Sequence, residues 1–184
     1  MKKTDRRVAK TRNAIFEALL ALMQEKRFEA ITMQAVAERA DVNRGTIYLH
    51  FTDKYDLLDK LVAEKLAALM QIFELQFQKN GSCVEDYTPI FRYFQENFAF
   101  YALLLSDRGA AFFRVRLHET ILKITTEQNR GIRPEGLRVA LVNEMVASGF
   151  TGLIEWWIKS GMAYPPEEMA RQMALFFSYT FGSR

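Results

Sequence analysis

Residues 32–54, TMQAVAERADVNRGTIYLHFTDK, contain two short helical segments separated by a tight turn. Thr32 is suited to cap the first helix, because its hydroxyl can accept a free backbone N–H at the helix start. Asn43 is suited to cap the second helix, which we expect to run from Arg44 to about His50. Two helices that meet at a steep angle across a short turn form a helix-turn-helix, whose second helix enters the major groove of DNA.

The second of these helices has a polar side and an apolar side. Ile47 and Phe51 are four residues apart, so they lie on one face and point inward. Gly45 costs about 1 kcal/mol relative to Ala inside a helix, and two interpretations are open: local fraying, or close approach to a phosphate or base. Because Arg44 and Thr46 flank the glycine, we favour the close approach.

The run VNRGTIYLHF (residues 42–51), with Asp53-Lys54 and Leu57-Leu58 after it, resembles the DNA-binding domain of the TetR/AcrR family of bacterial transcriptional regulators. The resemblance extends over about residues 11–62. Asp41 stands where such turns often carry Gly. The family often carries Ser at the position of Asn43, and Asn caps helices as well as Ser does.

We expect the operator contacts to come from the two helices and their caps, and the resemblance implies that Lys54 reaches a phosphate. The candidate DNA-binding residues are Thr32, Gln34, Asn43, Arg44, Gly45, Thr46, Tyr48, His50 and Lys54.

Positive charge is concentrated in the N-terminal third of the chain. Residues 1–60 hold 12 Lys and Arg against 9 Asp and Glu, whereas residues 61–184 hold 13 of each. A basic arm next to a recognition helix is expected to contact phosphates and to make binding dependent on salt. This basic arm consists of Lys2, Lys3, Arg6, Arg7, Lys10 and Arg12.

The composition predicts an all-α protein with a real core, because 49% of its 184 residues are hydrophobic and only 4 are Pro and 9 Gly. We expect a helix-turn-helix domain at 1–52 and a helical effector-binding and dimerisation domain at 53–184, joined by a long shared helix. The remaining expected helices cover about 5–26, 53–79, 85–105, 107–129, 134–159 and 166–182.

The C-terminal half is expected to form a homodimer, through helices at about 135–160 and 166–182. Small residues on the first of them, including Gly149 and Gly152, allow close backbone approach, and paired recognition helices need a two-fold interface. The alternative is that these residues pack only within the monomer. In the family that the chain resembles, the last two helices of each subunit form a four-helix bundle.

The same half is rich in aromatic residues and Met with occasional polar groups, a composition that suits an apolar pocket between helices. The alternative is an ordinary core. We expect a small apolar or amphipathic effector whose identity the sequence does not give. The candidate ligand-binding residues are Phe94, Phe98, Tyr101, His118 and Asn143.

The favoured function is a ligand-responsive DNA-binding regulator that acts as a repressor on a palindromic operator. The rival is a protein–protein adaptor that keeps the fold and acts without DNA. An enzyme is disfavoured, because the sequence has no metal-ligand cluster, phosphate loop or nucleophile motif, and we expect no cofactor and no metal. One cysteine, Cys83, excludes an internal disulfide, and no apolar run approaches the ~18 residues of a membrane span, so we expect a cytoplasmic protein.

Overall fold

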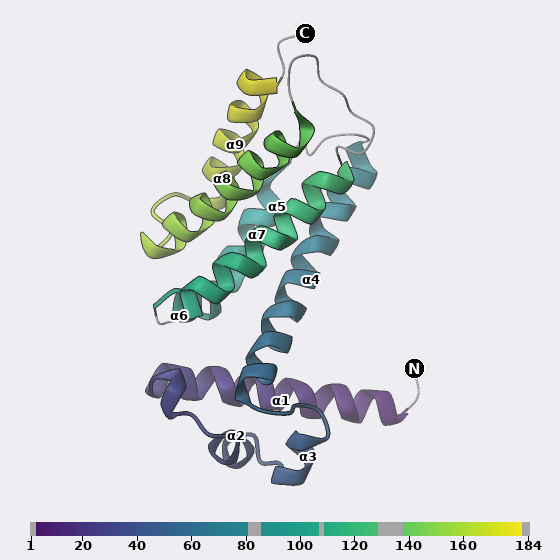
Figure 1. Cartoon of the computed structure of the whole chain (residues 1–184), viewed down its shortest axis with the longest axis vertical. Coiled ribbons are helices and arrows are strands. Elements are labelled where there is room, and N and C mark those ends of the chain that lie inside the picture. The colour runs from purple at the N-terminus through teal and green to yellow at the C-terminus, as the bar shows by residue number, and fades with distance from the viewer. Residues whose placement is uncertain (1–2, 81–85, 107–108, 129–137, 182–184) are drawn as a thin grey trace. The chain divides into compact units, whose positions relative to one another are not determined.

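The structure is a computed structural model that describes residues 3–80, 86–106, 109–128 and 138–181 (Figure 1). Every regular element in these ranges is a helix, which confirms the all-α class. The chain divides into two compact units, Met1–Glu64 and Lys65–Arg184. The division falls inside a long helix and not at residue 52, where the sequence suggested a domain boundary. That boundary remains a prediction.

The first unit contains the helix-turn-helix. Helix α1 (Lys3–Glu25) is followed by a short 3-10 helix, η1 (Phe28–Ala30), and then by α2 (Met33–Arg39) and α3 (Arg44–Tyr48). Helix α2 packs on both α1 and α3. The first eleven residues of α4 (Lys54–Asn80) complete this unit.

Both predicted caps of the helix-turn-helix are confirmed. The Thr32 hydroxyl accepts a hydrogen bond from the Ala35 N–H at 3.1 Å, and the Asn43 side-chain oxygen accepts one from the Gly45 N–H at 2.8 Å. Asp41 adopts φ +52°, a left-handed conformation that Asp tolerates better than most residues. The turn therefore forms without a glycine. Helix α3 ends at Tyr48, two residues before the predicted end.

The start of α4 is capped by Asp53. The Asp53 carboxylate accepts hydrogen bonds from the N–H groups of Tyr55 at 2.8 Å and Asp56 at 2.9 Å. The Asp56 carboxylate in turn accepts the Thr52 N–H at 2.8 Å. Acidic groups at this position also suit the positive end of the helix dipole.

The second unit contains α5 (Thr88–Glu96), α6 (Phe98–Ser106), α7 (Gly109–Gln128), α8 (Val139–Lys159) and α9 (Pro166–Phe181), together with the rest of α4. Helix α8 packs along α7, and α9 packs along α5. Helix α6 contacts both α7 and α8.

The expected single helix over residues 85–105 was wrong, because α5 and α6 are separate helices. Asn97 lies between them with φ −107° and ψ +20°, outside the helical region. Its amide nitrogen donates to the Tyr93 carbonyl at 2.8 Å, and its amide oxygen accepts from the Lys65 ammonium at 2.6 Å. The break is thus held by a contact with α4, which local sequence cannot reveal.

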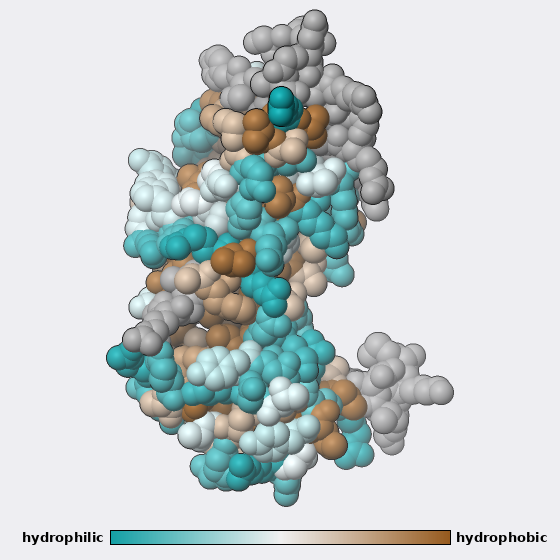
Figure 2. All heavy atoms as spheres, viewed as in Figure 1, coloured by the Kyte–Doolittle hydropathy of each residue, from teal (hydrophilic) through white to brown (hydrophobic). Residues whose placement is uncertain are grey.

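Helix α8 starts later than expected, since Arg138 has an extended backbone and the helix begins at Val139. The expected start at about residue 134 lies outside the described residues, as does Cys83. No helix of the described residues is long and apolar enough to cross a membrane. On the face shown in Figure 2, hydrophobic side chains reach the surface of each unit between hydrophilic ones.

Candidate nucleic-acid interface

Helix α3 is anchored by one face and presents the other to solvent. Ile47 and Phe51 are buried, at 0% and 2% exposure, and the Phe51 ring packs on that of Phe16 in α1. Burying two such side chains stabilises the docking of the helix by several kcal/mol, at about 1.5–3 kcal/mol each. On the opposite side, Arg44 and Gly45 are exposed. The expectation of an inward face at Ile47 and Phe51 is confirmed.

Arg44 and Tyr48 form a pair on the exposed face of α3. The guanidinium carbon lies 5.5 Å from the centre of the tyrosine ring, and Nη2 lies 3.4 Å from the phenolic oxygen. These residues are one helical turn apart, which is the spacing that brings side chains together. A guanidinium stacked on a ring keeps most of its N–H donors directed outward, as recognition of a guanine edge requires.

Gly45 lies close to the side chain that caps its own helix. A Cβ at this position would lie 3.3 Å from the Asn43 side-chain oxygen that caps the helix. The absence of a side chain at Gly45 therefore leaves space for the Asn43 cap. It also leaves the exposed side of the helix flat at this point. Close approach to DNA remains a prediction.

The remaining candidates on α2 and α3 differ in exposure. Thr32 and Gln34 are exposed, and the Gln34 amide donates to the Glu38 carboxylate at 2.7 Å. Thr46 and His50 are half-buried. The structure brings the exposed candidates of α3 together on one face, with Thr32 and Gln34 at the start of the neighbouring helix.

Lys60 holds the end of the recognition segment, and sequence reasoning missed it. Its ammonium donates to the His50 carbonyl at 2.9 Å and to the Asp56 carboxylate at 2.9 Å. The pKa of Asp56 is lowered mainly by the hydrogen bond from Lys60 and further by the one from the Thr52 N–H. The i, i+4 spacing of Asp56 and Lys60 was visible in the sequence, but the contact with His50 was not.

The Lys54 ammonium is bound within the protein, and its implied contact with a phosphate remains a prediction. Its ammonium donates to the carbonyls of Phe28, Glu29 and Ile31 at 3.0, 2.7 and 3.0 Å. An ammonium has three N–H donors, and all three are used here. Lys54 therefore fixes the start of α4 to the segment between α1 and α2.

The described side chains of the basic arm differ in exposure. Arg12 forms an ion pair with Glu64 and lies over the Phe16 ring, so it contributes to packing. Arg7 and Lys10 are exposed. Lys2 lies outside the described residues, and the side chains of Lys3 and Arg6 are likewise not described.

The five candidate ligand-binding residues belong to the interior of the second unit or to its α7–α8 surface. Phe94 and Tyr101 are fully buried, with ring centres 4.9 Å apart, and burial raises the pKa of Tyr101. His118 Nε2 lies 3.2 Å from the Glu144 carboxylate and 3.3 Å from the Ser148 hydroxyl. Asn143 is buried and donates to Thr126, and Phe98 is half-buried.

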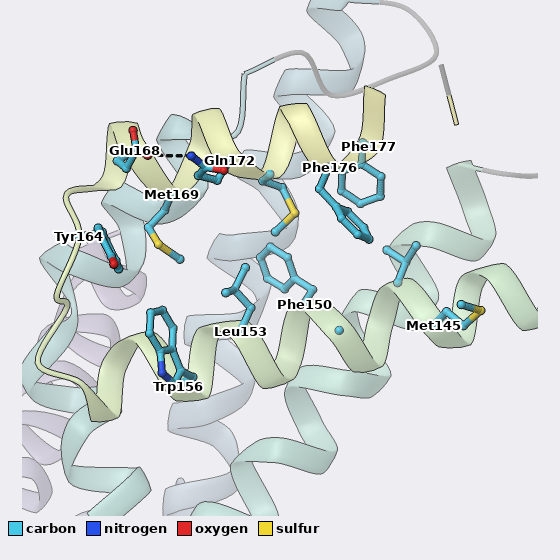
Figure 3. A pocket seen from close by; sticks show the side chains of 13 residues that line it. Met145, Phe150, Leu153, Trp156, Tyr164, Glu168, Met169, Gln172, Phe176 and Phe177 are labelled. Carbon is cyan, nitrogen blue, oxygen red and sulfur yellow. Dashed lines mark hydrogen bonds between the residues drawn. The ribbon is translucent and has the colours of Figure 1, made fainter. Parts of the chain in front are cut away.

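A groove of about 680 Å³ lies elsewhere, between α8 and α9. Aromatic and Met side chains from the two helices point toward one another across it, and none of the five candidates lines it (Figure 3). Its polar groups include Glu168 and Gln172, which are hydrogen-bonded to each other at 2.9 Å. The lining residues are Met145, Val146, Gly149, Phe150, Leu153, Trp156, Tyr164, Glu168, Met169, Gln172, Met173, Phe176 and Phe177.

A capped, exposed second helix on a three-helix unit defines a helix-turn-helix protein of the DNA-binding class. Comparison with known proteins narrows the class. Residues 15–61 match the family described as bacterial regulatory proteins, tetR family, and residues 85–179 match a transcriptional regulator C-terminal region of the same family. Since the second match covers more than half of the chain, the chain belongs to the TetR family of transcriptional regulators.

Individual relatives agree with this assignment. An uncharacterized HTH-type transcriptional regulator, YxbF of Bacillus subtilis, is 24% identical over 95% of this chain and 46% of its own length. The repressor KstR of Rhodococcus jostii is 46% identical over 29% of this chain and 26% of its own. The chain thus spans about half of the first relative and a quarter of the second.

Among solved structures, the regulator FadR of Bacillus subtilis in complex with stearoyl-CoA has a similar fold. It is 20% identical, with a TM-score of 0.55 over 88% of this chain and 94% of that one.

Proposed function

We propose that this protein is a homodimeric repressor that binds a palindromic DNA operator and is released by a small apolar or amphipathic effector. The observation that carries the DNA-binding part is the exposed Arg44–Tyr48 pair on a helix whose opposite face is buried. Phosphate contacts would come from the exposed Arg7 and Lys10 and would make the affinity fall with salt. Since its partner is chromosomal DNA, we place the protein in the cytoplasm.

Dimerisation is supported by an exposed stripe along α8. Leu141, Met145, Gly149, Gly152 and Trp156 follow one another at three- or four-residue steps, so they share one face. Leu141, Met145 and Trp156 are 61%, 73% and 49% exposed. An apolar helical face of this kind is characteristic of an interface.

The two glycines of the stripe strengthen this argument. A Cβ at Gly149 or Gly152 would have no neighbour within 4 Å, so packing within the monomer does not require either glycine. Each costs about 1 kcal/mol relative to Ala in a helix. A partner helix that approaches closely would require them. We therefore infer that a second copy of the chain covers this stripe and fills the groove between α8 and α9.

The route from effector to DNA would be α4, because its residues contribute to both units. Three side chains in its first turns bind the helix-turn-helix: Lys54 holds residues 28–31, Asp56 holds the Thr52 N–H and Lys60 holds the His50 carbonyl. Any displacement of this end of α4 must move the end of the recognition segment with it. A coupling free energy of about 1–3 kcal/mol suffices for regulation.

The interior of the second unit is the proposed effector site, and the five candidates Phe94, Phe98, Tyr101, His118 and Asn143 remain the proposed contacts. The Thr151 hydroxyl is buried and makes no hydrogen bond within the part of the chain that the structure describes. Apolar pockets use a few such polar groups to orient a ligand. Because FadR is found in complex with stearoyl-CoA, we propose long-chain acyl-CoA thioesters as the first effector class to test.

The test of DNA binding uses fluorescence anisotropy with operator DNA and three proteins: wild type, Arg44→Ala and Lys26→Ala. Lys26 is an exposed cation at the end of α1, outside the proposed interface, and serves as the matched control. We expect a loss of about 10–100-fold for Arg44→Ala and little change for Lys26→Ala. Equal affinity of all three would refute the proposed interface.

The adaptor alternative is tested by the same titration at two salt concentrations. A regulator that neutralises phosphates must weaken steeply as salt rises, whereas an adaptor without a DNA site should show no specific binding at either concentration. Stearoyl-CoA added to the complex is expected to release the DNA. Retention of DNA at saturating stearoyl-CoA would exclude that effector.

A further inference from the structure

Leu49 is the most exposed large apolar side chain in the part of the chain that the structure describes, with 82% of its surface open to solvent. It stands directly after the last residue of α3, within the segment that would enter the groove. Its backbone N–H continues the helical pattern by donating to the Gly45 carbonyl at 3.2 Å. Leu49 therefore has a fixed backbone and a side chain that contributes little to the core.

The position of Leu49 places it on the proposed DNA-facing surface. Residues four apart share a helix face, and side chains lean toward the N-terminus of their helix. Leu49 thus shares its face with Gly45, which has no side chain to cover it. The Arg44–Tyr48 pair forms the adjacent row on the same exposed side. The hydrogen-bond donors of Arg44 and the apolar side chain of Leu49 therefore lie next to each other on this exposed surface.

The chemistry of the major groove then selects the partner of Leu49. A leucine side chain neither donates nor accepts hydrogen bonds, and the apolar group that a base pair displays in the major groove is the C5-methyl of thymine. We infer that Leu49 reads a thymine methyl group in each operator half-site and so contributes to sequence specificity. This inference rests on the proposed function, since it requires α3 to enter the groove.

The test is a methyl-deletion scan of the operator selected by the protein. Each thymine is replaced in turn by deoxyuridine, which lacks only the C5-methyl, and binding is measured for wild type, Leu49→Ala and Leu75→Ala. Leu75 is an exposed leucine on α4, outside the helix-turn-helix, and is the matched control. All three proteins are first compared by circular dichroism to establish that they are equally folded.

We expect one thymine per half-site whose methyl deletion weakens wild-type and Leu75→Ala binding about 4-fold, the value for one buried methyl-sized group. Leu49→Ala should bind the two DNAs equally at that position. Two results would overturn the inference while leaving the proposed function intact. One is that methyl deletion weakens wild type and Leu49→Ala equally at every thymine, and the other is that it weakens wild-type binding at no thymine. Failure of the wild-type protein to select any operator would overturn both.

Discussion

Replacement of both exposed glycines of α8 by alanine, Gly149→Ala with Gly152→Ala, is expected to have opposite effects on the monomer and the dimer. Each methyl enters open space in the monomer, so each removes the helix penalty of glycine, about 1 kcal/mol. The monomer should therefore become more stable toward unfolding by roughly 2 kcal/mol. At a close helix–helix contact the same methyls overpack, at a cost of about 1–3 kcal/mol per contact.

The assay combines sedimentation velocity over a range of protein concentrations with urea unfolding at dilutions where the proteins are monomeric. Two such contacts cost about 2–6 kcal/mol together. We expect the dissociation constant of the double variant to rise at least about 30-fold, since 1.4 kcal/mol corresponds to tenfold. Gly161→Ala is the control, because Gly161 has φ +68° and lies after the end of α8. It should lower stability by about 1 kcal/mol and leave association unchanged.

A double variant that gains stability and still associates like wild type would refute the reasoning, because the glycines would then face solvent in the dimer. A double variant whose monomer is less stable than wild type would show that Gly149 and Gly152 do not face open space in the monomer, which is the basis of the expected gain in stability.

The remaining predictions concern the Asn43 cap of α3, the hydrogen bond from Lys60 to the His50 carbonyl, and the ion pair of Arg114 in α7 with Glu155 in α8. Asn43→Ala should lower the free energy of unfolding by about 1 kcal/mol, measured by urea titration, because it removes the acceptor of the Gly45 N–H. Lys60→Met should weaken operator binding while changing its salt dependence little, because Lys60 positions His50 and is not proposed to touch phosphate. An unchanged affinity would contradict this positioning role. The hydrogen bond from Arg114 lowers the pKa of Glu155 to about 2. A lowered carboxylate pKa stabilises the fold fully above about pH 4.5 and ceases to do so as the pH falls toward 2. Thermal melts at pH 5, 3.5 and 2 should therefore show a smaller acid loss for Glu155→Gln than for wild type, and parallel losses would count against this role.

Local sequence was sufficient to predict the helix-turn-helix. Thr32 and Asn43 cap through hydrogen bonds that span two or three residues, so their neighbours in the sequence determine them. Ile47 and Phe51 follow the helical period and are buried as expected. Capping and periodicity are short-range effects, and these are the features that one sequence displays.

Features that depend on distant partners could not be predicted in this way. Asn97, at the end of α5, accepts a hydrogen bond from Lys65 of α4. Lys54 donates its hydrogen bonds to backbone carbonyls more than twenty residues away in the sequence. The sequence indicates a basic arm that includes Arg12, whereas in the fold Arg12 forms an ion pair with Glu64. The groove between α8 and α9 was also missed, because its lining reads as ordinary core in the sequence.

Selection of operators from a pool of random duplex DNA, repeated at two salt concentrations, tests the central claim most directly. We expect the wild-type protein to recover an inverted repeat with two equivalent half-sites, and Arg44→Ala to recover it less efficiently and with relaxed preference at one base pair of each half-site. Weak binding that has no sequence preference and disappears at the higher salt concentration would contradict the account and favour a protein that does not act on DNA.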